Sequence, residues 1–146
     1  MRLLPALALA LSVSFGAASL AASAADPAAK PAGKYQVVFH ISGPEQVLWG
    51  QALNNAASMM NNIGKENIEL EVVVHGEGIG MLMLDSPQAT RVSDAMKAGV
   101  KFVACQQTMK FRKLTKDDML PDIGYVPAGV KEILDKQRAG WQYLKG

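Results

Sequence analysis

The chain has 146 residues, with 15 lysines and arginines against 13 aspartates and glutamates and a formal net charge of +2. Hydrophobic residues make up 49% of it, which excludes a disordered polyelectrolyte, and the balanced, dispersed charge argues against a dedicated nucleic-acid binder. A single cysteine excludes a scaffold held together by intrachain disulfides.

The first 24 residues have the features of a secretory signal peptide. Arg2 gives a basic start, residues 3–20 are apolar and uncharged, and residues 22–24 (ASA) match the small-x-small pattern that signal peptidase cleaves. An uncleaved membrane anchor is the alternative. Residues 25–33 contain proline and alanine without an apolar period and predict a flexible leader. We therefore expect residues 34–146 to form one periplasmic domain that has no membrane contact after cleavage.

Strand and helix patterns alternate along this domain. Strands are predicted at Tyr35–Ile41, Ile68–His75 and Val100–Cys105, with a brief fourth strand at Tyr125-Val126. Three helices are predicted: one with Leu48, Ala52, Ala56, Met59 and Ile63 on its apolar side, one at Gln88–Ala98, and one that begins at Pro127 and carries Val130, Ile133, Leu134, Gln137 and Trp141 on one side. Thr115 and Asp118 resemble a capping pair. The alternation implies right-handed crossovers and an α/β fold, a three-layer α/β/α sandwich with a mostly parallel sheet.

Three residues whose side chains can react or bind ligands lie at one edge of this predicted sheet. In open parallel sheets, ligands bind beyond the carboxyl ends of the strands. His40 lies near the end of the first predicted strand, His75 ends the second, and Cys105 ends the third. The sequence therefore places both histidines and the only cysteine where a ligand pocket is expected.

Cys105 carries the main functional hypothesis. A thiol at the end of a strand faces the loops, where helix N-termini or an imidazolium stabilise the nucleophilic thiolate. Such a thiolate attacks sulfane sulfur and holds it as a persulfide. The alternative is a buried cysteine that packs as a small hydrophobic side chain. Since a lone thiol in an oxidising compartment is exposed to mixed disulfides, it requires either burial or use, and both interpretations remain open.

The two histidines are weaker candidates. His75 is predicted to lower the pKa of Cys105 or to hydrogen-bond a bound sulfur species, with a packing role as an equal alternative. His40 lies inside the first strand, which favours a satisfied core residue over a side chain of the ligand pocket. The three side chains together could ligate zinc or copper, but no HxxxH or CxxC pattern supports such a site. We expect neither a metal nor a cofactor.

A glycine-rich segment follows the second predicted strand. Gly76, Gly78 and Gly80 permit close approach of the backbone to a ligand, but a complete dinucleotide fingerprint is missing and no P-loop ending follows. We interpret the segment as a loop that lines the pocket above Cys105. Residues 81–84 (MLML) are predicted to pack in the core or at a subunit contact.

Basic residues gather after Cys105, at Lys110, Arg112, Lys113 and Lys116. Such a run is usually a solvated face; the alternative is that it attracts anionic sulfur species such as thiosulfate or polysulfide toward the thiol. Further along the chain, Trp141 and Tyr143 are interpreted as packing residues.

Three segments of the chain resemble the DsrE/DsrF-like family, whose fold is called YchN-like. They are residues 72–76 (VVVHG), residues 99–105 (GVKFVAC), and the tail 126–133 (VPAGVKEI) with the Gln137, Gly140-Trp141 and Tyr143 that follow it. The resemblance extends from about Tyr35 to Lys145. It implies an α/β/α sandwich that assembles into homo-oligomers, often trimers or hexamers.

The resemblance also implies a function. In the sulfur-handling members of the family, which are cytoplasmic, a cysteine that matches Cys105 accepts persulfide sulfur and passes it to partner proteins. The predicted signal peptide departs from that pattern. The sequence thus predicts a periplasmic sulfur carrier, at most sulfurtransferase-like, with Cys105 as acceptor, His75 as activator, and sulfur donor or acceptor proteins or small sulfur anions as partners. The alternatives are a non-enzymatic protein that binds a small ligand or metal in the strand-end pocket, and a structural role in an oligomer.

Overall fold

A computed structural model of the chain describes residues 33–146, and these form one compact unit. The signal peptide predicted for residues 1–24 and the leader that follows it lie outside the described residues. Within residues 33–146, no helix is both long enough and apolar enough to cross a membrane.

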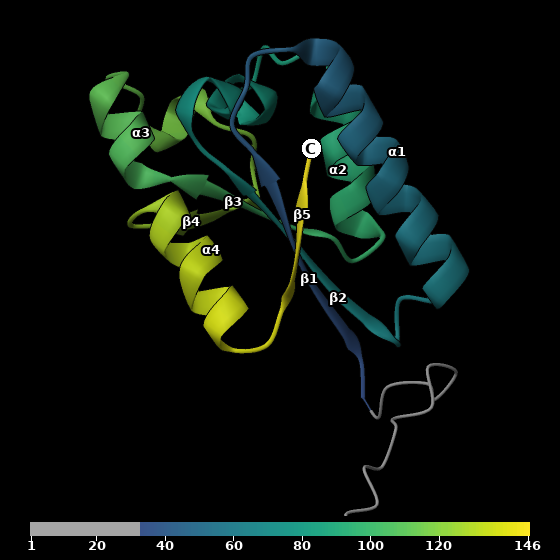
Figure 1. The fold of residues 1–146 in the computed structure, drawn as a ribbon. Coiled ribbons are helices and arrows are strands. Elements are labelled where there is room, and N and C mark those ends of the chain that lie inside the picture. The colour runs from purple at the N-terminus through teal and green to yellow at the C-terminus, as the bar shows by residue number, and fades with distance from the viewer. Residues whose placement is uncertain (1–32) are drawn as a thin grey trace, which may run out of the picture. The chain divides into compact units, whose positions relative to one another are not determined.

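Five parallel strands form a single sheet in the order β4-β3-β2-β1-β5 (Figure 1). Their bounds are β1 Tyr35–Ile41, β2 Ile68–Val74, β3 Lys101–Cys105, β4 Gly124–Val126 and β5 Gln142–Lys145. The predicted fold class is therefore confirmed. The four predicted strands lie within one residue of their expected bounds. They could be predicted because runs of β-branched residues are typical of strands that are buried on both sides.

Helices cover both faces of the sheet. The α-helices are α1 Gln46–Ile63, α2 Ala89–Lys97, α3 Gln106–Phe111 and α4 Gly129–Arg138, and two 3-10 helices are η1 Gly76–Leu82 and η2 Lys116–Asp118. In Figure 1, α1 and α2 lie on one side of the strands and α4 lies on the other, while α3 follows the end of β3 and buries Met109 in the large cluster. The predicted capping pair is confirmed, because Thr115 and Asp118 form a reciprocal capping box at η2.

Strand alternation divides the apolar core into two unequal clusters. On β2, Leu70 and Val72 point into a large cluster that also holds Phe39 and Phe102, under α1 and α2. Val73 points the opposite way, into a small cluster under α4 with the four other buried residues Val38, Val103, Val126 and Ile133. Most of the hydrophobic stabilisation therefore comes from one face of the sheet.

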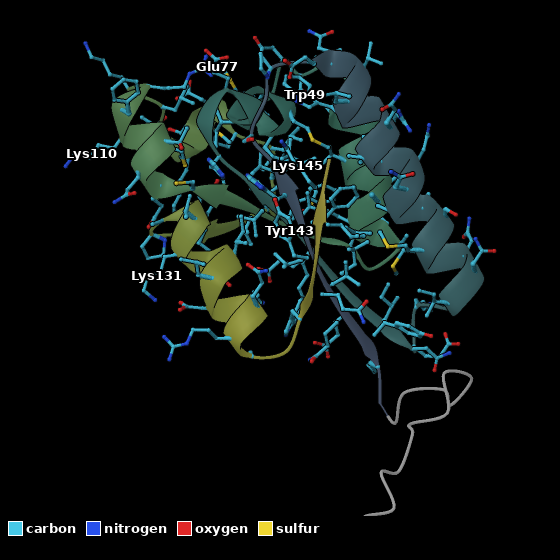
Figure 2. The ribbon with its side chains drawn as sticks, viewed as in Figure 1. Trp49, Glu77, Lys110, Lys131, Tyr143 and Lys145 are labelled. Carbon is cyan, nitrogen blue, oxygen red and sulfur yellow. The ribbon has the colours of Figure 1, made fainter. Side chains whose placement is uncertain are left out.

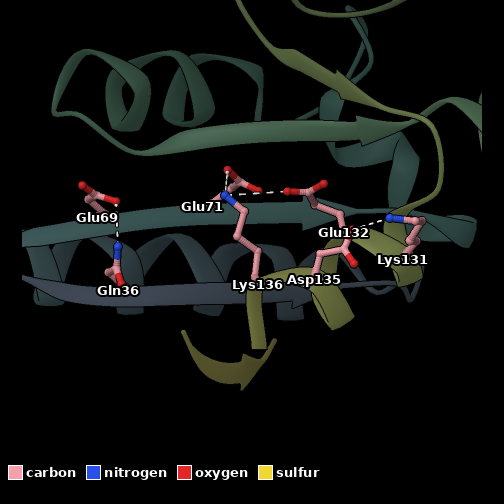
Figure 3. Close-up of polar contacts among 7 residues, drawn as sticks. All are labelled: Gln36, Glu69, Glu71, Lys131, Glu132, Asp135 and Lys136. Carbon is pink, nitrogen blue, oxygen red and sulfur yellow. Dashed lines mark hydrogen bonds and ion pairs between the residues drawn. The ribbon is translucent and has the colours of Figure 1, made fainter. Parts of the chain in front are cut away.

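A buried ion cluster helps to hold α4 on the other face (Figure 3). The Glu71 side chain on β2 is 8% exposed, and Lys136 Nζ donates a hydrogen bond to its Oε2 at 2.8 Å. Lys136 Nζ also lies 3.6 Å from Glu132 and 4.0 Å from the centre of the Trp141 ring. Burial raises the pKa of Glu132, and the charge of Glu71 raises it further. Charged contacts therefore add to apolar packing in holding α4 on the sheet.

Several expectations for the helices need correction. The last helix begins at Gly129 rather than Pro127 and ends before Trp141, and its Val130 and Leu134 are 57% and 54% exposed. On α1, Ala52 and Ala56 are buried as predicted, but the buried side also includes Trp49, Leu53 and Met60, whereas Leu48 is 40% exposed. The structure also contains α3, η1 and β5, none of which was predicted.

Candidate functional site

The carboxyl ends of the strands border a cavity of about 780 Å³, a size typical of small-molecule pockets. Its lining residues are Pro44, Trp49, His75, Gly76, Glu77, Gly80, Cys105, Gln107, Thr108, Phe111, Arg112, Gly129 and Val130. Figure 2 shows Trp49 and Glu77 at this edge of the sheet. The cavity lies where the strand order led us to expect a pocket.

The register of β2 and β3 brings His75 and Cys105 to neighbouring positions. Val74 pairs with Ala104, so each strand delivers its next residue to the same edge. Gly129, at the start of α4, lies between them: a Cβ there would come within 3.0 Å of His75 Cβ and 3.3 Å of Cys105 Cβ. A glycine therefore lets α4 approach both residues without displacing either of them.

The Cys105 side chain is buried at the wall of the cavity and belongs to a polar environment. Burial raises the pKa of the thiol, but hydrogen bonds from the Thr108 hydroxyl and from the backbone N–H groups of Gly129, Thr108 and Gln107 outweigh burial and hold the pKa below its ordinary value. Such a site favours the thiolate, which is the reactive form of cysteine.

Thr108 is oriented for this role by the glycine-rich segment. Gly76 N–H donates a hydrogen bond to Thr108 Oγ1 at 3.0 Å, which leaves the hydroxyl proton free to point to the sulfur. Gly76 has φ +56°, and a Cβ there would lie 3.1 Å from Ser42 O, so the position favours glycine. The predicted role of this segment in lining the pocket holds for Gly76 and Gly80.

Gly78 and His40, both predicted at the ligand pocket, are not among the residues that line this cavity. Gly78 is buried against the backbone of Ile41, and the whole segment is the 3-10 helix η1 rather than a loop. His40 does not reach the cavity, and both of its ring nitrogens are hydrogen-bonded. This agrees with the prediction that its polar atoms are satisfied within the protein.

His75 is joined to His40 rather than to a charged group. Their Nε2 atoms are 2.7 Å apart, and His40 Nδ1 lies 2.8 Å from the Tyr143 hydroxyl on β5. Burial lowers the pKa of His75, and burial followed by the charges of His75 and Lys145 lowers the pKa of His40. Both rings are therefore neutral near pH 7. A neutral His75 carries no positive charge, and the hydrogen bonds that lower the pKa of Cys105 come from α3 and Gly129 instead.

The basic residues after Cys105 are spread over different surroundings. Arg112 lines the cavity, whereas Lys116 lies over the Tyr125 ring at 4.7 Å from its centre. Lys110 points away from the molecule (Figure 2). The run is thus mainly a solvated face, and only Arg112 among its members lines the cavity, which Glu77 also lines.

Sequence reasoning missed Thr108, Gly129 and the polar role of Tyr143. The spacing of Thr108, three residues after Cys105, was a usable signal, because residues i and i+3 lie on the same side of a helical turn. Tyr143, interpreted as a packing residue, is 39% exposed and bonds His40 instead. Trp141 does pack, against the small cluster under α4.

Residues 81–84 (MLML) are divided between the core and the surface. Met81 and Leu82 are fully buried in the large cluster, as predicted, while Leu84 is 56% exposed. Within residues 33–146, no group of three or more histidine, cysteine or acidic side chains is placed to hold a metal ion. The described donor set therefore does not fit the usual structural or catalytic zinc site.

The fold and the site define a class: α/β/α proteins with a cysteine beside a cavity at the carboxyl edge of a five-stranded parallel sheet. The chain belongs to the DsrE/DsrF-like family, which matches residues 36–145 and is associated with sulfur relay. No curated protein matches the chain.

Three solved structures are similar. MTH1491 from Methanobacterium thermoautotrophicum, a protein of unknown function, is 31% identical with a TM-score of 0.74, over 77% of this chain and 100% of that one. BT1422 from Bacteroides thetaiotaomicron is 12% identical with a TM-score of 0.64, over 76% and 94% of the two chains. The ychN protein from E. coli is 11% identical with a TM-score of 0.62, over 79% and 100%. The last two show the fold alone, and they confirm the YchN-like architecture.

Proposed function

We propose that this protein is an exported sulfur carrier that holds sulfane sulfur as a persulfide on Cys105. The observation that carries the proposal is the position of Cys105 at the wall of a cavity large enough for a small donor, beside Thr108 and backbone N–H groups that hold the pKa of the thiol below its ordinary value. A cysteine that only packs in the core needs neither a cavity nor donors that favour its charged form.

The chemistry follows from the thiolate. The Cys105 sulfur attacks the outer sulfur of a donor persulfide, a new S–S bond forms as the donor S–S bond breaks, and the donor thiolate leaves with the electron pair. The sulfur atom then stays on Cys105 until an acceptor thiol removes it. Arg112 at the cavity supplies a positive charge for an anionic donor such as thiosulfate or polysulfide.

Export and self-association are part of the proposal. The basic, apolar and small-residue pattern of residues 1–24 supports export to the periplasm. Exposed Val130 and Leu134, one turn apart on α4, together with Phe111 at 88% exposure, support a contact between copies of the chain, as a trimer or hexamer. Native mass spectrometry measures that state directly.

The decisive experiment is intact-protein mass spectrometry after exposure of the protein to polysulfide or thiosulfate. We expect a mass gain of one or more sulfur atoms, reversed by reductant and absent in Cys105→Ser. A folded wild-type protein that gains no sulfur, and whose thiol reacts only in denaturant, would contradict the carrier function.

Thr108→Val gives a second, quantitative test. Loss of the hydroxyl donor is expected to raise the pKa of Cys105, so the pH profile of alkylation by iodoacetamide shifts to higher pH and the rate near pH 7 falls several-fold. Thr115→Val, at η2, is the matched control and should leave the profile unchanged. Identical profiles for wild type and Thr108→Val would remove the hydroxyl from the mechanism.

A non-enzymatic ligand-binding protein is the second candidate, and the size of the cavity is the observation that favours it. It predicts ligand-dependent thermal stabilisation that survives Cys105→Ser, whereas a persulfide carrier loses its sulfur-dependent mass gain in that variant. The two functions are thus separated by one substitution.

A further inference from the structure

An unbroken row of hydrogen-bonding groups connects the exposed strand β5 with the cavity. The Tyr143 hydroxyl is 2.8 Å from His40 Nδ1, His40 Nε2 is 2.7 Å from His75 Nε2, and His75 lines the cavity. Tyr143 is 39% exposed and lies on β5 (Figure 2), so its hydroxyl reaches solvent. His75 Nδ1 makes no hydrogen bond within residues 33–146 and is free for a group in the cavity.

The geometry of the two rings requires them to share one proton. Their planes are 16° apart and their centres 4.7 Å apart, which fits an edge-to-edge hydrogen bond between the Nε2 atoms. One nitrogen must then donate and the other accept, because two N–H groups cannot face each other at this distance. The row therefore has two states, which differ in the direction of every hydrogen bond.

We propose that Tyr143, His40 and His75 form a proton path between solvent and the Cys105 cavity, with Tyr143 and His40 as positioning residues that set the protonation of His75. The inference rests on the proposed sulfur-carrier function and adds to it the source and destination of the proton that each sulfur transfer requires.

In the first state, His75 carries its proton on Nδ1. When Cys105 takes sulfur from a donor R–S–SH, the leaving thiolate R–S⁻ receives that proton and becomes R–SH. His40 then gives its Nε2 proton to His75 Nε2, Tyr143 gives its hydroxyl proton to His40 Nδ1, and the Tyr143 oxygen takes a proton from water. Charge and atoms balance, with one proton moved inward.

The second state serves the unloading step. An acceptor thiol R′–SH gives its proton to the now unprotonated His75 Nδ1, and R′–S⁻ attacks the outer sulfur of the Cys105 persulfide. The Cys105 S–S bond breaks, R′–S–SH leaves, and the Cys105 thiolate is restored with the electron pair. The protons in the row move back, and one returns to water, so loading and unloading together reset the path.

The surroundings suit this role. Neutral histidines can each both donate and accept, and burial keeps the pKa of each ring below its ordinary value. Among the described residues, the other titratable or charged groups at the pair or the cavity are Lys145 on β5, Cys105 on β3, Glu77 on η1 and Arg112, the residue that follows α3. The cavity residues from α1 and α4 are Trp49, Gly129 and Val130, none of which titrates.

The test uses Tyr143→Phe, which removes the hydroxyl and keeps the ring, with Tyr35→Phe on β1 as the matched control. The full protein is first loaded with polysulfide, and the loading is verified by mass. Dithiothreitol is then added as the acceptor, and the rate of sulfur loss is followed by quenched mass spectrometry across pH. We expect Tyr143→Phe to unload about tenfold more slowly near pH 7. The defect should vanish at high pH, where the acceptor is already a thiolate.

A structural role would slow unloading by the same factor at every pH, and that result would overturn the proton path, as would a rate equal to that of wild type throughout. His40→Gln, which cannot relay a proton, should reproduce the Tyr143→Phe profile, and a wild-type profile there would also overturn it. Because loading is measured first, a wild-type protein that never takes up sulfur refutes the carrier function together with the path. Normal loading with normal unloading of Tyr143→Phe refutes the path alone.

Discussion

On one face of the sheet, α1 and α2 cover a large apolar cluster, whereas on the other, α4 packs its Ile133 against four buried strand valines and contributes to an ion cluster around the buried Glu71. The cavity residues His75 and Cys105 lie at the carboxyl ends of β2 and β3, and α4 packs against both of them at Gly129. The two faces are thus divided: one supplies most of the apolar packing, and the other, more polar face carries the cavity and its candidate reactive residues.

The sharpest test of that division is a matched pair of core truncations. Phe102→Ala, in the large cluster, is expected to lower the free energy of unfolding by about 3–5 kcal/mol, because it removes a fully buried ring. Val73→Ala, in the small cluster, should lower it by about 2 kcal/mol. Urea unfolding measures both, and a larger loss for Val73→Ala would reverse the comparison.

The ion cluster under α4 gives the next largest effect. Lys136→Met leaves the buried Glu71 carboxylate without its cation and should lower the free energy of unfolding by about 3 kcal/mol. The double variant Glu71→Leu with Lys136→Met is expected to recover most of that loss. Lys131→Met, which breaks an exposed pair with Asp135, should change stability by less than about 0.5 kcal/mol. Equal effects of Lys131→Met and Lys136→Met would show that the cluster around Glu71 stabilises the fold no more than an exposed ion pair does.

Gly129→Ala should disturb stability and chemistry together. The added methyl group meets His75 and Cys105, and overpacking of this kind costs about 1–3 kcal/mol. The rate of Cys105 alkylation should also change, since the Gly129 N–H group donates to the thiol. Gly50→Ala, on α1, is the control, because its methyl group meets only the ends of flexible side chains. Thermal denaturation should show a neutral or slightly stabilising change, and the alkylation rate should stay the same.

The smallest expected effect is the pH dependence of stability from the histidine pair. Both folded pKa values lie below the ordinary 6.5, so below that pH the unfolded chain binds more protons than the folded one. Stability should therefore fall as the pH drops from 7 through about 6 toward the folded pKa values. Urea unfolding of His40→Gln across this range should show a shallower slope, and an unchanged slope would contradict the assigned pKa directions.

Much of the fold could be predicted because its elements are encoded locally. Runs such as 35–41 are rich in β-branched residues, and the apolar period of residues 48–63 is helical. The six residues of α3 have no such period, and β5 has only four exposed residues, so its position depends on pairing with β1. Short elements of this kind are determined by tertiary contacts, which a local pattern does not contain.

Only the part of the site at the ends of the strands could be predicted from the sequence. The ends of β2 and β3 placed His75 and Cys105 together because parallel strands in register finish at one edge. The bond between His40 and Tyr143 joins residues 103 positions apart, and the approach of Gly129 depends on how α4 packs. Neither has a signature in the local sequence. The activation of the thiol was assigned to His75 because an imidazole is a familiar partner, whereas Thr108 looked like an ordinary polar residue.

The Thr108 hydroxyl, which lowers the pKa of Cys105, also gives a criterion for the sequences of other proteins. A cysteine that ends a parallel strand, followed three positions later by threonine or serine on the first turn of a helix, is a four-residue C-x-x-[ST] signature with a stated physical meaning. Serine keeps the donor, whereas valine or alanine does not. When genomes are searched for carriers of this kind, that single position should separate chains whose cysteine is prepared for sulfur from those in which it only fills space.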